Sequence, residues 1–278
     1  MKALILGATG LLGKALLREW KQDDIVGMGS GDVDIREASR VERIVGQHGP
    51  DWIVLAAAYT DVDGCESNPG MALSVNRDGA VNVAKAARHS GAKLLFLSSD
   101  YVFDGKKKSP YETGDERNPQ SVYGRSKAEA ETGLLETLPG CCIARTSWLF
   151  GAGGKCFPDT ILKLAASRLV LDVVSDQRGS PTYTIDLARA IIELCHKDAS
   201  GIVHVTNSGD CSWFEFAREI VQGGGLQTEV RPASTQQMAR PAPRPAYSVL
   251  AAASLRRYGI ELPGWKDALR RYLEERKS

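Results

Sequence analysis

The segment YGRSK, Tyr123 to Lys127, combines a phenol and an amine that could exchange a proton with a carbonyl group. Residues four apart share a face of a helix, so an ammonium on Lys127 would stabilise a phenolate on Tyr123. This lowers the pKa of the phenol from its usual value near ~10 and prepares it for general acid–base catalysis. The pattern is loose, because an ordinary surface helix can contain a tyrosine and a lysine at this spacing.

Ser99 is the third residue that could take part in this chemistry. It ends the apolar run KLLFLSS, which is typical of a buried strand. Open α/β folds bind ligands at the carboxyl ends of their strands, so Ser99 could hydrogen-bond the same substrate oxygen as Tyr123. Taken alone, a serine in this position is more simply explained as a helix or turn cap.

The elements that must position these residues alternate between strand and helix. Such alternation predicts a parallel sheet covered on both faces, which is a doubly wound Rossmann-type α/β fold. Residues 1–147 and 181–210 are predicted to form the dinucleotide-binding domain. Residues 148–180 and 211–278 are predicted to form a smaller, mixed α/β substrate-binding lobe. Strands are expected at KALILG, DIVGMG, DWIVLAAA, KLLFLSS, CCIART, LVLDVV and GIVHVT, and helices at 11–20, 36–48, 71–90, 157–167 and 184–196, with another starting near Tyr123.

A glycine-rich turn follows the first predicted strand. In LILGATGLLGKAL, Gly7 would permit a tight turn, Gly10 would let backbone N–H groups approach a pyrophosphate, and Gly13 would let the helix pack closely on the sheet. A glycine turn without a ligand is the alternative, but the position directly after the first strand favours a dinucleotide site.

The end of the second predicted strand bears on the choice of cofactor. An acidic side chain there favours the ribose of NAD, and a basic one favours the 2′-phosphate of NADP. The segment GMGSGDVD has neither charge at its tip: Gly29 and Ser30 could admit a phosphate, and Asp34 and Ile35 could border the adenine. The segment therefore favours NADPH slightly, with NADH as the alternative.

Composition excludes several other classes of protein. The chain has 278 residues, a net charge of +1 and 43% hydrophobic residues, as an ordinary globular protein has, and nothing indicates binding to nucleic acid. No apolar run approaches the ~20 residues of a membrane span, and no signal peptide is recognised, so we expect a cytoplasmic protein. The six cysteines have no zinc-site spacing and indicate buried thiols.

Together, the three glycines, Ser99 and the Tyr123–Lys127 pair resemble the extended short-chain dehydrogenase/reductase superfamily. More narrowly, the segments SSDYVFDG, PYETGDERNPQSVYGRSKAEAE, ARTSWLFG, DQRGSPTYTIDLA, HVTNSGDCSWFEFA and RPAYSVL are similar to dTDP-4-dehydrorhamnose reductases, in matching order from residue 1 to about residue 250. The resemblance implies that NADPH or NADH reduces the C4 ketone of a nucleotide-linked 4-keto-6-deoxy sugar, most simply dTDP-4-dehydro-β-L-rhamnose.

The resemblance also implies roles for individual residues. Tyr123 would be the general acid, with Lys127 as its electrostatic partner and Ser99 beside it. The cofactor would contact Gly7, Thr9, Gly10, Leu11, Leu12, Gly13, Asp34, Ile35, Ala57, Ala58, Tyr59, Ser98, Tyr123 and Lys127. The sugar nucleotide would contact Thr60, Val62, Asp100, Trp148 and Arg244. Simpler roles exist for three of these: a turn for Asp100, core packing for Trp148 and a surface position for Arg244.

Two departures from the family pattern affect these expectations. Cys156 stands where the family usually has asparagine, which puts one substrate contact in question, and Ala15 stands where some members carry a glutamate of a metal-linked dimer. We therefore predict no metal, and the protein could be a monomer or a homodimer.

Three other functions occur on this fold, and the sequence argues against the first of them. A 4,6-dehydratase would need a carboxylate after Asp100, where the chain has Tyr101. A reductase or 4-epimerase of another nucleotide sugar, such as a UDP-linked one, would use the same residues. A non-catalytic NADP-binding regulatory subunit is the remaining alternative.

Overall fold

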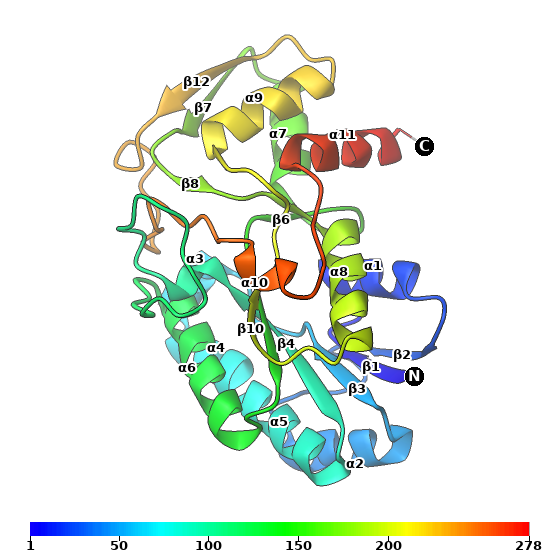
Figure 1. The fold of residues 1–278 in the computed structure, drawn as a ribbon. Helices are drawn as coiled ribbons and strands as arrows, with labels where there is room; N and C mark the ends of the chain where they lie inside the picture. The colour runs from blue at the N-terminus through cyan, green and yellow to red at the C-terminus, as the bar shows by residue number, and fades with distance from the viewer. Residues whose placement is uncertain (278) are drawn as a thin grey trace.

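The computed structural model describes residues 1–277 and contains a six-stranded sheet whose neighbouring strands are all parallel. The strand order is β10-β5-β4-β3-β1-β2, so the chain starts inside the sheet, proceeds to one edge and then builds outward on the other side. The predicted doubly wound sheet is confirmed, with its topological switch between β1 and β3 (Figure 1). The strands are β1 (Lys2–Leu6), β2 (Asp24–Met28), β3 (Trp52–Leu55), β4 (Lys93–Ser99), β5 (Cys142–Thr146) and β10 (Gly201–His204).

Helices cover both faces of this sheet (Figure 1). Side chains alternate between the faces along each strand, so Ala3 and Ile5 of β1 belong to one buried cluster and Leu4 and Leu6 to another. Both faces are therefore apolar, which explains why the strands read as continuous hydrophobic runs. On the first face lie α1 (Leu11–Glu19) and α8 (Thr184–His196), and on the second lie α2 (Ala38–His48), α5 (Gly79–Ser90) and α6 (Val122–Thr137).

The long helix predicted over residues 71–90 is interrupted. It consists of α4 (Pro69–Leu73), a π-helical turn η1 (Ser74–Asp78) and α5. Asn76 of this turn is buried; its side chain accepts a hydrogen bond from the N–H of Tyr59 (2.7 Å) and donates to the carbonyl of Tyr59 (3.0 Å) and to Ser126 Oγ (2.9 Å). The wide turn thus anchors the segment after β3 to α6, and sequence periodicity alone did not reveal it.

The remaining elements form a smaller lobe above the carboxyl ends of the sheet strands (Figure 1). Three strand pairs build it: β7 with β12 in parallel, β8 with β11 in antiparallel, and β6 with β9 in parallel. The strands are β6 (Leu149–Phe150), β7 (Val170–Val174), β8 (Arg178–Gly179), β9 (Thr182–Tyr183), β11 (Cys211–Ser212) and β12 (Glu229–Ala233), and the helices are α7 (Phe157–Ala165), α9 (Trp213–Gly223), α10 (Ala253–Arg256) and α11 (Trp265–Glu275).

Two short helices complete the fold at the edge where the two parts meet: α3 (Val62–Ser67) and the 3₁₀ turn η2 (Asp100–Val102). The chain leaves the sheet after β5 and returns to it with α8 and β10. The predicted domain limits stay a prediction. Within residues 1–277, no helix is both long and apolar enough to span a membrane. All six cysteines are buried free thiols.

Candidate active site

A cleft of about 980 Å³ runs along the carboxyl ends of the strands and reaches into the smaller lobe. It brings together most of the residues singled out in the sequence. Gly13, Tyr59 and Arg244 lie outside its lining. The predicted residues that line it are Gly7, Thr9, Gly10, Leu11, Leu12, Asp34, Ile35, Ala57, Ala58, Thr60, Val62, Ser98, Ser99, Asp100, Tyr123, Lys127 and Trp148.

The glycine turn between β1 and α1 is shaped by close backbone contacts. Gly7 has φ of 96°, and a Cβ there would lie 2.5 Å from the backbone nitrogen of Ala57. A Cβ on Gly13 would lie 2.2 Å from the carbonyl oxygen of Gly7, so Gly13 serves helix packing rather than ligand contact. Gly10 is the N-cap of α1 and lines the cleft. The N-terminus of α1 therefore opens onto the cleft, at the position where a pyrophosphate is predicted to bind.

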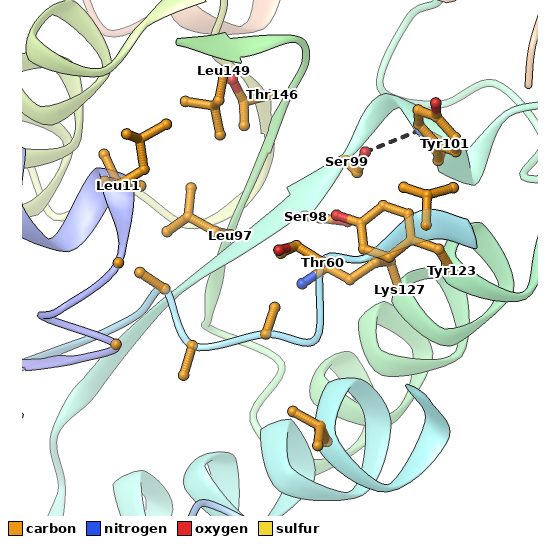
Figure 2. A pocket seen from close by; sticks show the side chains of 18 of the residues that line it. Leu11, Thr60, Leu97, Ser98, Ser99, Tyr101, Tyr123, Lys127, Thr146 and Leu149 are labelled. Atoms are coloured by element: carbon orange, nitrogen blue, oxygen red, sulfur yellow. Dashed lines mark hydrogen bonds between the residues drawn. The ribbon is translucent and has the colours of Figure 1, made fainter. Parts of the chain in front are cut away.

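The helix α6 places Tyr123 and Lys127 in the cleft. Its N-cap, Ser121, accepts a hydrogen bond from the N–H of Gly124 (3.1 Å). A Cβ on Gly124 would lie 2.2 Å from the carbonyl oxygen of Tyr101, so the helix start packs closely on η2. Figure 2 shows Tyr123 and Lys127 side by side and Ser99 at the end of β4 facing the same space.

Burial dominates the protonation of this pair. The pKa of Tyr123 is raised above its usual value, chiefly by desolvation, while hydrogen bonding with Ser99 opposes the rise. Burial lowers the pKa of Lys127 to about 7, opposed by the negative charge of Glu131. The expectation that the pKa of Tyr123 is lowered is therefore wrong, because the low-polarity surroundings disfavour the charged forms of both residues.

Ser99 caps a turn, which was one of the two roles considered for it. Its hydroxyl donates to Asp100 Oδ1 (2.8 Å) and accepts from the backbone N–H of Tyr101 (3.2 Å), which caps η2. Figure 2 shows the second of these contacts. Ser99 thus caps a turn and lines the cleft at once.

Asp100 is buried, and its Oδ2 has no hydrogen-bond partner among the described residues. Burial raises the pKa of Asp100 to about 6, while interactions with Ser248 and Ser99 lower it. An unpartnered buried carboxylate oxygen is costly. Because Asp100 also lines the cleft, this oxygen is suited to receive a hydroxyl group of a ligand.

At the end of β2, both nearby acids are already engaged. Asp32 Oδ2 accepts a hydrogen bond from the N–H of Gly29 (2.8 Å). The carboxylate of Asp34 is held by Arg36, whose Nε lies 2.9 and 3.0 Å from its two oxygens. Arg36 also lines the cleft and holds the pKa of Asp34 below its usual value. Sequence reasoning missed Arg36, which adds a cation at this end of the cleft.

Trp148 forms part of the wall, in an unusual conformation. Its backbone φ is 48°, in the left-handed region. Its ring stacks on Trp213 with centroids 3.5 Å apart and an interplanar angle of 6°, and a Cβ on Gly179 would lie 2.5 Å from the indole. The ring is thus covered in part by protein rather than fully open to a sugar. Trp213 and Phe157, which also line the cleft, were missed because nothing in their local sequence marks them.

Arg244 has a different position from the one expected. Its guanidinium makes a two-point contact with Asp63 of α3, with Nη1–Oδ1 and Nη2–Oδ2 distances of 3.0 and 2.9 Å. Asp63 also accepts from the N–H of Ala242 (3.1 Å), so the proline-rich loop is fastened to α3. In this conformation Arg244 is engaged with Asp63 and is not exposed to the cleft. Its substrate contact remains a prediction.

Lys155 and Cys156 also line the cleft, from the loop before α7. The thiol of Cys156 is within hydrogen-bonding distance of Tyr272 Oη (3.4 Å) and Asp159 Oδ2 (3.4 Å). Burial raises the pKa of this thiol. Cys156 therefore joins the loop to the lobe, where the family's asparagine would offer an amide.

A doubly wound sheet, a glycine turn at a helix start and a Ser–Tyr–Lys set in one cleft define a dinucleotide-dependent oxidoreductase of the short-chain dehydrogenase/reductase type. Comparison with known proteins narrows this class. The chain belongs to the family described as "RmlD substrate binding domain", whose model matches residues 1–278. The predicted resemblance is thereby confirmed.

Two curated relatives and one solved structure illustrate the family. The chain is 42% identical to the spore coat polysaccharide biosynthesis protein SpsK of Bacillus subtilis, covering 100% of this chain and 98% of that protein. It is 38% identical to a probable dTDP-4,6-dihydroxy-2-methyloxan-3-one 4-ketoreductase of Streptomyces antibioticus, covering 97% and 94%. The dTDP-4-dehydrorhamnose reductase of Bacillus anthracis, solved in complex with NADP, is 39% identical with a TM-score of 0.96, covering 99% of each chain.

Proposed function

We propose that this protein uses NADPH to reduce the C4 ketone of a dTDP-linked 4-keto-6-deoxy sugar, with dTDP-4-dehydro-β-L-rhamnose as the first candidate. The observation that carries the proposal is the convergence of Ser99, Tyr123 and Lys127 on a cleft that also contains the glycine turn. The family relatives named for reduction of dTDP-linked sugars support it.

The residues of the turn fit a dinucleotide. Gly7 and Gly13 leave no room for a Cβ, and the N-terminus of α1 at Gly10 faces the cleft. Thr9, Asp34 and Ile35 line the same end. Ser30 supplies a hydroxyl there, and Asp32 and Asp34, the two acids that follow β2, are engaged with the N–H of Gly29 and with Arg36, which favours NADPH over NADH. When bound, the cofactor supplies the hydride that adds to C4.

The protein's own residues handle the proton. Reduction starts from the phenol form of Tyr123, and its raised pKa keeps that proton in place until the ketone oxygen gains negative charge. The ammonium form of Lys127 then stabilises the phenolate that remains. Ser99 orients the ketone oxygen by hydrogen bonding. Because the single proton of its hydroxyl is donated to Asp100, Ser99 must redirect it to bind the ketone oxygen.

Substrate recognition is proposed to involve the lobe side of the cleft. Thr60 and Val62 follow β3, Asp100 offers its unpartnered oxygen, and Trp148 forms an apolar wall. Arg244 could reach a diphosphate only after exchanging its contact with Asp63. We propose that the enzyme acts in the cytoplasm as a monomer or homodimer on a free nucleotide sugar.

The test is NADPH oxidation, followed by absorbance, with dTDP-4-dehydro-L-rhamnose and a panel of other dTDP-, UDP- and GDP-linked 4-keto sugars. Tyr123→Phe should lower kcat/KM by ~10² to 10⁴, as loss of a general acid does. Tyr258→Phe removes a hydroxyl bonded to Ser200, far along the chain from the site residues, and should leave activity unchanged. Absence of turnover with every sugar, or equal rates for wild type and Tyr123→Phe, would refute the proposal.

Two alternatives have distinct signatures. A 4-epimerase would retain NAD through purification and convert a sugar without net oxidation of NADPH. A regulatory subunit would bind NADPH but turn over nothing in the panel. The position after Asp100 holds Tyr101, whose ring meets Tyr123 edge-on at 5.6 Å, so the site has no dehydratase carboxylate there.

A further inference from the structure

A buried carboxylate follows the Tyr123–Lys127 pair on the same helix. Glu131 is one helical turn after Lys127 on α6 and has 0% exposure. Its Oε1 accepts from Ser98 Oγ (2.5 Å) and Arg145 Nε (2.9 Å). Its Oε2 accepts from Arg145 Nη2 (2.6 Å) and Arg117 Nη1 (3.2 Å). These four hydrogen bonds fix the carboxylate in one orientation.

Stability alone is a weak reason for such a group. Burying a carboxylate and a guanidinium costs free energy that their attraction repays only in part, and an apolar pair of similar volume is often as stable. One hydrogen-bond partner of Glu131 and one residue a helical turn before it lead to the cleft instead. Ser98, whose hydroxyl proton is given to Glu131, lines the cleft, and Lys127, four residues before Glu131, lines it too.

Few other groups around Lys127 can stabilise its ammonium form. Its Nζ lies 3.9 Å from the centroid of the Phe96 ring, and its side chain is buried. Burial lowers its pKa, and the negative charge of Glu131 is what raises it. Other charged or titratable groups on neighbouring elements act elsewhere: Asp100 and Cys65 influence Tyr123, Asp100 influences Tyr101, and Arg77 pairs with Asp78 and Glu129.

We propose that Glu131 is a positioning residue of the reductase: it stabilises the ammonium form of Lys127 and fixes the hydroxyl of Ser98 at the cofactor wall. The expected effect on activity rests on the proposed function, whereas the effect of Glu131 on Lys127 does not. Arg145 and Arg117 hold the carboxylate in place. Glu131, Arg145 and Arg117 thus support residues of the cleft without lining it themselves.

The kinetic test compares pH profiles of kcat/KM. Activity falls at high pH when Lys127 loses its proton, so the basic limb reports the pKa of the Tyr–Lys pair. In Glu131→Gln we expect this limb to move down by about one pH unit, the lower end of the effect of an opposite charge a few ångströms away. At pH values above this limb, the shift corresponds to a roughly tenfold loss of kcat/KM, mainly through kcat. At low pH the change should be smaller.

Arg117→Gln is the matched control. It removes a partner of the same carboxylate, from a side chain 28% exposed, but leaves the negative charge beside Lys127. Its basic limb should not move down. If Glu131→Gln alone fails to fold, the double variant Glu131→Gln with Arg117→Gln keeps the net charge of the network and should again show the lowered limb. An unchanged limb in a folded variant that lacks Glu131, or an equal downward shift in Arg117→Gln, overturns the proposal.

A second readout does not depend on turnover. Lysine labelled with ¹³C at Cε allows the ammonium of Lys127 to be titrated by NMR, with Lys127→Arg identifying its resonance. The pKa of Lys127 should be lower in the variants that lack Glu131 than in wild type, and an equal value overturns the inference. If wild type reduces no sugar but this pKa falls, the proposed function fails and the electrostatic role of Glu131 stands.

Discussion

Replacing Lys127 with methionine should stabilise the protein while abolishing its activity. Methionine has a similar length and no charge, and Lys127 is buried with its pKa lowered to about 7 from 10.5. Between these values the unfolded chain binds a proton that the folded chain does not, so the wild-type free energy of unfolding rises with pH. Below about pH 7 the lysine is protonated in both states, and the full cost of its burial is present.

The magnitude follows from the shift. At pH 6 the buried lysine costs about 4 to 5 kcal/mol. At pH 9 the folded protein holds this lysine neutral, and the cost falls to about 2 kcal/mol. The contact of the ammonium with the Phe96 ring is already contained in this pKa. The variant should therefore be more stable than wild type by about 4 to 5 kcal/mol at pH 6 and by about 2 kcal/mol at pH 9.

Urea denaturation of both proteins at pH 6 and pH 9 measures the gap, and NADPH oxidation confirms the loss of activity. Lys85→Met replaces an exposed lysine on α5 and is the control; its difference from wild type should be the same at both pH values. A Lys127→Met protein less stable than wild type at pH 6, or a gap that does not depend on pH, would refute the account of Lys127 as a costly buried cation kept for function.

Two other substitutions test the site. Asp100→Asn removes a charge whose pKa is raised to about 6, so we expect a lower kcat/KM and loss of an acidic limb near pH 6; a pH profile with that limb intact would contradict the role of Asp100. Because a raised carboxyl pKa destabilises the folded protein as pH rises from 3.8 to about 6, the same variant should be less sensitive to pH in that window, as denaturation would show. Gly13→Ala would set a Cβ 2.2 Å from the carbonyl oxygen of Gly7, and should weaken NADPH binding at least tenfold or prevent folding; titration of NADPH fluorescence measures this, and wild-type affinity would refute the packing argument.

Much of the fold was predictable because its signals are local. Short aliphatic runs alternating with helical segments indicate a parallel sheet, since only strands buried on both faces are apolar throughout. The glycine spacing after the first strand indicates a tight turn into a helix, because few other residues can adopt the backbone conformation of such a turn. The break between α4 and α5 was not predictable, because the π-helical turn depends on contacts of Asn76 with Tyr59 and Ser126.

The candidate site also has features that the sequence predicts and features that depend on the tertiary structure. The sequence by itself indicated the proposed catalytic set, because Ser99, Tyr123 and Lys127 stand out by residue type, spacing and position at a strand end. Only the tertiary structure decided their protonation, since the pKa values of Tyr123 and Lys127 depend on burial by segments far along the chain. It also revealed Arg36, Trp213 and Glu131, whose roles arise from neighbours brought close by folding, and it placed Arg244 on Asp63, a partner 181 residues away.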